Sequence, residues 1–421
     1  MVDQNKVIYG CIEPSAGITI KGMFNIRGPQ QYIAYTSRSF TYFGKYPNNS
    51  FEGNGVYYDF EQYFTYIGGF RDSFKNGFGI LLQYQKAAYE YRSADNISSA
   101  TEFEAYSASL QKLIATQLDN WRPKCESFKT FVKKLEGHVG KGIIDKIREV
   151  CNKTKYEEIN KLQPPRTTYT YIGELKDDQR DGFGISFLRN GDIYLGSYSK
   201  NKRAGFGMYL WSEANSKNGS THYIGYHNNN AFVKYGAVYS LGEELYLGEI
   251  VNGSFNGRGK QVIGKTTYEG EFKQGKKHGF GKYETEDYKF EGLFDKDSAN
   301  GDGIQRWNQF EFQGQFKDGV KVYKCEIVHD DKEVYKGDIT DGVISGKGIL
   351  NIHNNKYEGD FRDNDLEGKC KVTYKNGAQC DCTFVNGVRK GEAIITLPPD
   401  KGLVRGESKR LIFESDVATN I

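Results

Sequence analysis

The chain has 421 residues, among them 50 Gly, 31 Tyr and 27 Phe but only 8 Pro. Abundant glycine without proline excludes a collagen or a low-complexity linker, and this aromatic content excludes a disordered chain. The 57 basic residues nearly balance the 54 acidic ones, for a net charge of +3, so we expect no nucleic acid partner and no general attraction to membranes.

The N-terminal residues and the cysteines indicate the compartment. Residues 1–6 are polar and do not begin a secretory apolar region, and no apolar run approaches the roughly 20 residues that a membrane span needs. Seven cysteines, an odd and scattered set, favour a reducing compartment over a disulfide framework. These features predict a cytoplasmic protein.

A frame of four residues recurs along the chain: an aromatic residue, then glycine two, eleven and thirteen positions later. Tyr268, Gly270, Gly279 and Gly281 form the clearest copy. With a period of two, the ring and the glycines share one face of a strand, and charged residues take the other. We expect the glycines to leave space that a ring fills. A polar turn at residues 275–277 would join two strands into a β-hairpin, which needs a neighbour like itself to bury its rings.

Twelve copies follow one another in chain order, after a degenerate N-terminal cap at residues 1–41. Two copies occupy residues 42–84 and ten occupy residues 167–397, and residues 398–421 are expected to form a tail. The copies start at positions 42, 66, 171, 194, 223, 246, 268, 290, 312, 335, 357 and 380. Those at 223, 312 and 380 lack one or more of the frame residues, so we expect local departures from the regular hairpin there.

Residues 85–166 interrupt the repeats with a different composition. Apolar residues recur there at three- and four-residue spacing, from Leu110 to Trp121 and again in two later segments, which is typical of amphipathic helices. Pro123 and the glycines of residues 137–142 are expected to break the segment. We predict an α-helical insertion of two or three helices, packed on the sheet or projecting from it. A coiled-coil arm is the alternative, although three sustained heptads are not visible.

The repeated frame resembles the MORN repeat (membrane occupation and recognition nexus) over most of the chain. The resemblance implies an all-β repeat array, in which tandem antiparallel β-hairpins form an elongated twisted meander or solenoid. Proteins with long MORN arrays and no enzyme domain are often axonemal components, radial-spoke proteins among them, or cortical cytoskeletal proteins. By this resemblance we expect a non-enzymatic scaffold in a cytoskeletal assembly, foremost the axoneme of a cilium or flagellum.

Two other functions remain open at this point. One is a peripheral membrane tether that binds anionic phospholipids through basic turns, and the other is a regulatory subunit of a separate enzyme. A basic turn at Lys273, Lys276, Lys277 and Lys282 is the candidate contact with anionic headgroups, and a solvated loop is the alternative. The expected partners are other proteins of a cytoskeletal complex. A homodimer is a further alternative, because an open sheet has unprotected edges.

The aromatic residues of the best copies form a second candidate surface. We expect their rings mainly to pack within the sheet, while a ring left open would contact a partner peptide or helix. These residues are Tyr171, Tyr194, Tyr246, Tyr268, Phe290, Tyr335 and Tyr357.

No motif in the chain predicts catalysis. Residues 259–266 match the string of a phosphate-binding P-loop, but such a loop lies between a strand and a helix, whereas these glycines belong to a repeat and its turn. Cys370, Cys380 and Cys382 are close in sequence but lack the paired spacing of a zinc site, so we expect small buried hydrophobes. We therefore predict no catalytic residue, no cofactor and no metal.

Overall fold

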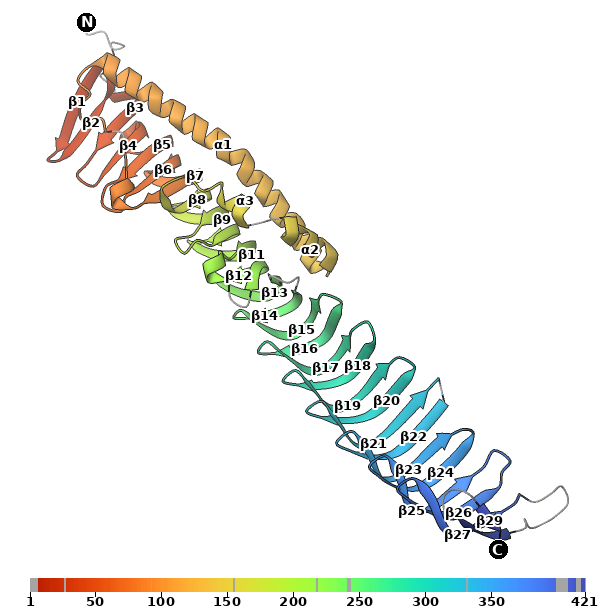
Figure 1. Ribbon diagram of the computed structural model, residues 1–421. Helices are drawn as coiled ribbons and strands as arrows, with labels where there is room; N and C mark the ends of the chain where they lie inside the picture. The colour runs from red at the N-terminus through yellow and green to blue at the C-terminus, as the bar shows by residue number, and fades with distance from the viewer. Residues whose placement is uncertain are drawn as a thin grey trace. The chain divides into compact units, whose positions relative to one another are not determined.

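The computed structural model in Figure 1 describes residues 7–25, 28–91, 93–153, 156–216, 219–240, 244–330, 332–398, 408–413 and 418–420. The chain divides into two compact units, Met1–Ser254 and Phe255–Ile421. The described residues form 29 strands and three α-helices. The predicted all-β repeat array with an α-helical insertion is confirmed.

The strands of the first unit pair antiparallel, each with the next one in the chain. They are β1 (Ile8–Ser15), β2 (Ile18–Asn25), β3 (Gly28–Thr36), β4 (Phe40–Lys45), β5 (Glu52–Asp59), β6 (Phe64–Arg71), β7 (Phe74–Tyr84), β8 (Thr167–Lys176), β9 (Gln179–Phe187), β10 (Ile193–Ser199), β11 (Lys202–Leu210), β12 (Ser220–Asn228), β13 (Ala231–Ser240) and β14 (Leu245–Val251). β7 pairs directly with β8, although the insertion of residues 85–166 separates them in sequence.

The second unit continues the same pattern of consecutive antiparallel strands. They are β15 (Ser254–Ile263), β16 (Thr266–Lys273), β17 (Lys276–Glu284), β18 (Tyr288–Asp295), β19 (Ser298–Trp307), β20 (Phe310–Lys317), β21 (Val320–His329), β22 (Lys332–Thr340), β23 (Val343–Ile352), β24 (Asn355–Arg362), β25 (Asp365–Thr373), β26 (Gln379–Val385), β27 (Val388–Thr396), β28 (Ser408–Phe413) and β29 (Ala418–Asn420).

The two ends expected to be a cap and a tail also contain paired strands. β1 to β3 occupy the described part of the cap, and β28 and β29 extend the meander beyond the last repeat. Residues 1–6, 399–407, 414–417 and 421, to which the same expectations applied, lie outside the described residues.

Short turns join the strands of each hairpin. In the copy that starts at Tyr268, Gln274 and Gly275 have φ angles of 52° and 83°. Positive φ at two successive residues is typical of a type I′ turn, whose twist matches that of the flanking strands. The turn therefore lies at residues 274–275, and Lys276 and Lys277, expected in the turn, belong to β17 instead.

The position eleven residues after each ring, here called the bulge position, has a positive φ in all twelve copies. At the Tyr268 copy, the ladder between β16 and β17 shifts register at this position, because Gly270 pairs with Gly281 whereas Glu271 pairs with His278. Glycine adopts such a backbone without strain, so this glycine serves backbone conformation and not the packing space we expected. The residues are Gly53, Gly77, Gly182, Gly205, Lys234, Gly257, Gly279, Gly301, Tyr323, Gly346, Gly368 and Gly391.

The other two glycines of the frame do provide packing space. Gly173 and Gly184 lie opposite each other on β8 and β9, and the ring of Tyr171 covers them. A Cβ atom built on Gly184 would lie 2.6 Å from Tyr171 Cζ, so no other residue fits there. The Tyr171 hydroxyl donates a hydrogen bond to the carbonyl oxygen of Glu174, 2.6 Å away.

Eight tyrosines repeat this hydrogen bond to the carbonyl oxygen three residues later, at 2.6–3.0 Å. They are Tyr42, Tyr66, Tyr171, Tyr194, Tyr223, Tyr246, Tyr268 and Tyr335. Because the bond satisfies a phenol that would otherwise be buried without a partner, it explains why tyrosine outnumbers phenylalanine at the ring position.

The insertion folds into one long helix and two short ones. α1 (Ala100–Gly140) starts with a capping box, in which Ser99 Oγ accepts from the Glu102 amide and the Glu102 carboxylate accepts from the Ser99 amide. The expected break at Pro123 is wrong, because the proline lies on the exposed side within a continuous helix. Its cost of about 3 kcal/mol is offset by burial of flanking residues such as Trp121 and Cys125.

The helices cover one face of the first unit's sheet, the reverse face, which we define as the side opposite the rings. α1 contacts β1, β2 and β5 to β12 and lies across these strands (Figure 1), whereas α2 (Ile144–Lys153) contacts β13 and β14. α3 (Tyr156–Asn160) adds Ile159 to the same core. The helices therefore pack on the sheet, and a projecting coiled-coil arm is not formed.

Two glycines of β7 allow the two roles of glycine, backbone conformation and packing space, to be tested separately. Gly77 occupies the bulge position with φ of 75°, and no described atom lies within 4 Å of a Cβ built there. We expect Gly77→Ala to destabilise the hairpin by about 1 kcal/mol, through backbone strain alone. Gly79→Ala would place its Cβ 2.6 Å from Tyr66 Cζ and should cost more, about 3 kcal/mol. Hydrogen exchange of β6 and β7 measures both, and equal costs would contradict the distinction.

Candidate interaction surfaces

Within each unit, rings of the frame pack against neighbouring aromatic residues on the ring face. Tyr268 meets Phe272 of its own strand and Phe294 of β18 edge to face, with centroid distances of 5.1 Å in both pairs. Of the seven candidate aromatic residues, Tyr171, Tyr194, Tyr246, Tyr268, Phe290 and Tyr335 are buried, and Tyr357 is half-buried. A partner cannot reach the buried six, so they serve internal packing.

Nine positions after the ring, a side chain lies over the ring layer. Arg180 lies 4.9 Å from the ring centroid of Tyr198, and Lys277 lies 5.6 Å from that of Tyr268. Other copies place Phe, Ile, Leu or Ala at this position. This position was not predicted, although Lys or Arg recurs nine residues after the ring in the sequence. The cations are Lys75, Arg180, Arg203, Lys277, Lys321 and Arg389.

On the reverse face, the residues one and fourteen positions after the ring differ in type between the two units. In the copies from 42 to 223 they are apolar and belong to the core shared with α1. They are Phe43, Val56, Ile67, Ile80, Ile172, Ile185, Leu195, Met208, Ile224 and Ala237. Apolar residues at these positions identify the strands that the helix covers. This pattern in the sequence was not used to predict them.

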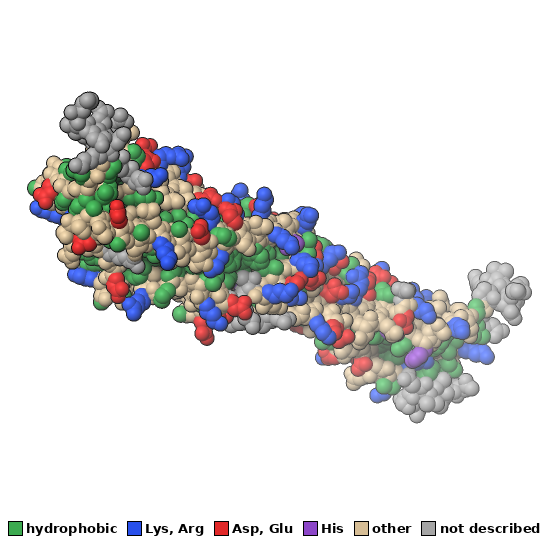
Figure 2. All heavy atoms as spheres, turned by 90° about the horizontal axis from the view of Figure 1, so that it is seen from above, with side chains coloured by type: hydrophobic (Ala, Val, Ile, Leu, Met, Phe, Trp, Pro, Cys, Tyr) green, Lys and Arg blue, Asp and Glu red, His purple; other side chains and the backbone are tan. Residues whose placement is uncertain are grey.

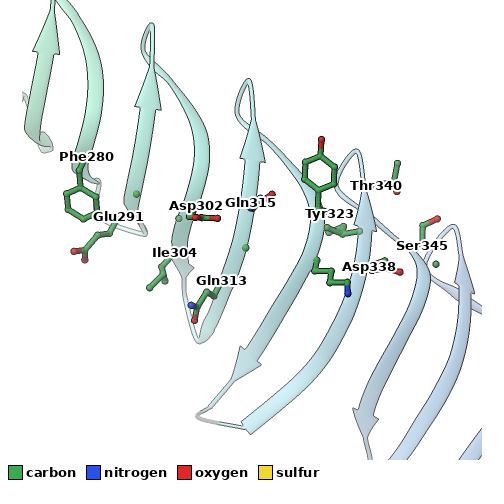
Figure 3. Close-up of a pocket in the computed structure, with 16 residues that line it drawn as sticks. Phe280, Glu291, Asp302, Ile304, Gln313, Gln315, Tyr323, Asp338, Thr340 and Ser345 are labelled. Carbon is green, nitrogen blue, oxygen red and sulfur yellow. The ribbon is translucent and has the colours of Figure 1, made fainter.

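In the second unit the same positions are mostly charged or polar, as in Glu269, Lys282 and Lys336. The reverse face carries an open groove there, with a volume of about 1070 Å³, that runs across β17 to β23 (Figure 3). Its lining includes Phe280 and Tyr323 among acidic and amide side chains. The groove occupies the face that α1 occupies in the first unit.

The family model of the MORN repeat matches residues 66–82, 171–193, 194–213, 268–288 and 357–379. The chain carries MORN repeats. The matched segments coincide with the copies that begin at 66, 171, 194, 268 and 357. Among curated proteins, none matches the chain. MORN repeats indicate a protein-interaction or membrane-associated role, and the repeat family is generally non-catalytic.

The candidate basic turn of the MORN copy at Tyr268 does not form one patch. Lys277 lies over the rings of Tyr268 and Tyr283, and Lys282 pairs across strands with Glu291 at 2.9 Å. Lys273 and Lys276 are exposed. Figure 2 shows basic and acidic side chains interspersed over the visible surface, without a patch of one sign. The four lysines thus have different roles, and two of them are held by contacts within the sheet.

Neighbouring lysines provide a matched test of this difference. We expect Lys277→Glu to destabilise the hairpin of β16 and β17 by about 1 kcal/mol, because it replaces a cation above two rings with an anion. Lys276→Glu, at an exposed position, should change stability by less than about 0.5 kcal/mol. Hydrogen exchange of the two strands measures both effects. Equal effects of the two changes would show that the cation over the rings is unimportant.

His227 occupies a place in the ring layer that is aromatic in most other copies and aliphatic in the rest. It is buried, and its ring centroid lies 4.9 Å from that of Tyr194 and 5.2 Å from that of Tyr223. Burial, together with the nearby Arg203 cation, lowers the pKa of His227 from 6.5 to about 3. The imidazole is therefore neutral in the folded protein at neutral pH.

This burial predicts a pH dependence. The unfolded chain protonates His227 near pH 6.5, whereas the folded chain does so only near pH 3. Because the unfolded state binds more protons between these values, stability falls as the pH is lowered, by about 2 kcal/mol from pH 7 to pH 5. We expect His227→Phe to remove this part of the dependence, measured by denaturant unfolding at the two pH values. A variant with unchanged pH dependence would contradict the assignment.

The P-loop string and the three cysteines that are close in sequence both belong to the repeat structure. Gly259 lies in β15, Gly264 in the turn that follows, and Thr266 begins β16, so the P-loop string is followed by a strand. Cys370, Cys380 and Cys382 are buried. In the part of the chain that the structure describes, no three His, Cys, Asp or Glu side chains could hold a metal ion, and no helix could cross a membrane.

Proposed function

We propose that the protein is a non-catalytic scaffold, built into a cytoskeletal assembly, that binds other proteins along its MORN repeats. The observation that carries the proposal is the packing of α1 on the reverse face of the first unit. A helix of the same chain packs there across ten strands, which supports a mode of binding in which a partner helix lies across such a sheet. The ring face is self-packed, so the reverse face and the strand ends are the surfaces left for partners.

The axoneme of a cilium or flagellum is the assembly that we propose first. The support is the resemblance to axonemal MORN proteins that consist of repeats without an enzyme domain. The near balance of charges adds support, because a part enclosed in a large complex has little use for one dominant sign. The membrane-tether alternative receives no such support from the basic turn, since Lys277 and Lys282 have partners within the sheet.

Fractionation of a flagellated cell that expresses the tagged chain tests the proposal. We expect the protein to stay with the axoneme after mild detergent and to leave it only in high salt or a chaotrope, because several protein contacts would hold it. The matched control is a chain with Lys273→Glu and Lys276→Glu, which should fractionate in the same way. Release of the unmodified chain with the detergent-soluble membrane fraction would refute the proposal.

A further inference from the structure

The reverse face of the second unit contains one apolar island within its polar surface. Phe280, Leu293 and Tyr323 expose 48%, 41% and 64% of their surface, and the half-buried Ile304 lies on β19, one of the two strands between β18 and β21. Phe280 and Leu293 are directly opposite each other on β17 and β18. Large exposed side chains gathered on one face mark a contact surface more often than scattered ones do.

Tyr323 is the most unusual member of the island. It occupies the bulge position of its MORN copy with φ of 64°, where ten of the twelve copies have glycine. A side chain in this backbone region costs about 1–2 kcal/mol. In Figure 3 its ring stands out from β21 at the groove. A strained backbone that holds up an exposed ring is typical of a binding site.

The charge of the groove limits what can bind. Its lining carries the carboxylates of Glu291, Asp302 and Asp338 and the ammonium group of Lys324. The lining groups carry a net charge of −2, and Lys282, which pairs with Glu291 at 2.9 Å, reduces the local acidic excess to −1. An occupant with an apolar stripe and basic flanks complements this surface.

The packing of α1 in the first unit shows why a helix fits across strands with this repeat. Its buried residues Leu118, Cys125, Val132 and Val139 recur every seven positions. Seven helical residues rise about 10.5 Å, close to the roughly 9.6 Å that two neighbouring strands occupy. Each heptad therefore meets the next hairpin in equivalent register. The second unit repeats the same hairpin spacing, and its reverse face is uncovered along the groove.

We propose that the groove binds a basic amphipathic helix of a partner protein, with Phe280, Ile304 and Tyr323 of its lining as apolar contacts and Leu293, opposite Phe280, beside them. The island extends from β17 to β21, a width of about 19 Å, which matches about 13 helical residues or two heptads. This proposal rests on the proposed function, since it names the chemistry of one partner of the scaffold.

The test uses the full chain and a synthetic peptide of two heptads, with leucine on one helical face and lysine on the other. Binding is measured by fluorescence anisotropy. We expect Tyr323→Gly and Phe280→Thr each to weaken binding at least about tenfold, as central aromatic contacts do. Tyr323→Gly relieves the strained backbone, so loss of folding cannot explain its effect. Ile263→Ser, which removes an apolar side chain that is exposed but lies outside the groove, is the matched control.

Two further peptides establish the chemistry. Glutamate in place of lysine should abolish binding, and the same residues in strict alternation, a strand pattern, should bind at least about tenfold more weakly. Binding that is insensitive to Tyr323→Gly and Phe280→Thr, or equal for all three peptides, would overturn the proposal. A dimer in solution that Tyr323→Gly dissociates would also overturn it, because a second copy would then be the occupant. Retention in the axoneme is a separate readout, so either proposal can fail alone.

Discussion

The contact on which the structure depends is a tyrosine ring lying over two opposed glycines. Neither glycine can be replaced without a clash, as the Tyr171 ring over Gly173 and Gly184 illustrates. Register follows from this contact, because a slip of one residue would place a Cβ under the ring and turn the ring to the other face. The phenol hydroxyl is satisfied by a carbonyl three residues later in its own strand, so each hairpin needs no partner for its polar atoms. Within each unit the hairpins can therefore repeat, because each one supplies its own ring, glycines and hydrogen bond.

Because of this arrangement, residue types on the two faces of the sheet are not equally constrained. The ring face is committed to packing, with rings, glycines and a cation or apolar side chain over each ring. The reverse face is not needed to form the hairpin, so its residues can change without loss of the fold. In the first unit they are apolar, as at Ile172 and Ile185, and α1 buries them. In the second they are mostly charged, as at Glu269 and Lys282. Differences in what such a sheet binds should therefore reside on the reverse face.

The frame, the insertion and the absence of a strand-loop-helix around residues 259–266 could be predicted because each depends on spacing along the chain. What could not be predicted depends on three-dimensional context. Pro123 carries a strong local signal for a break, but packing of Trp121 and Cys125 on the sheet outweighs it. The bulge glycine and the packing glycine look alike in sequence, although one serves φ and the other space. The apolar reverse-face positions of the first unit could also have been predicted, because they recur one and fourteen residues after each ring.

The imperfect copies show where the fold tolerates a cost. Lys234 and Tyr323 keep the positive φ of the bulge position although both have a side chain, so the register of the ladder overrides the preference of the residue. Lys234 recovers part of this cost inside the chain, because its ammonium group lies 5.6 Å from the ring centroid of Tyr226. Tyr323 differs, since nearly two thirds of its surface is exposed and its ring points away from the sheet core. A contact that another molecule makes with this ring would offset the cost of the strained backbone. The strained and exposed ring of Tyr323, more than the size of the groove, favours the reverse face of the second unit as a binding surface.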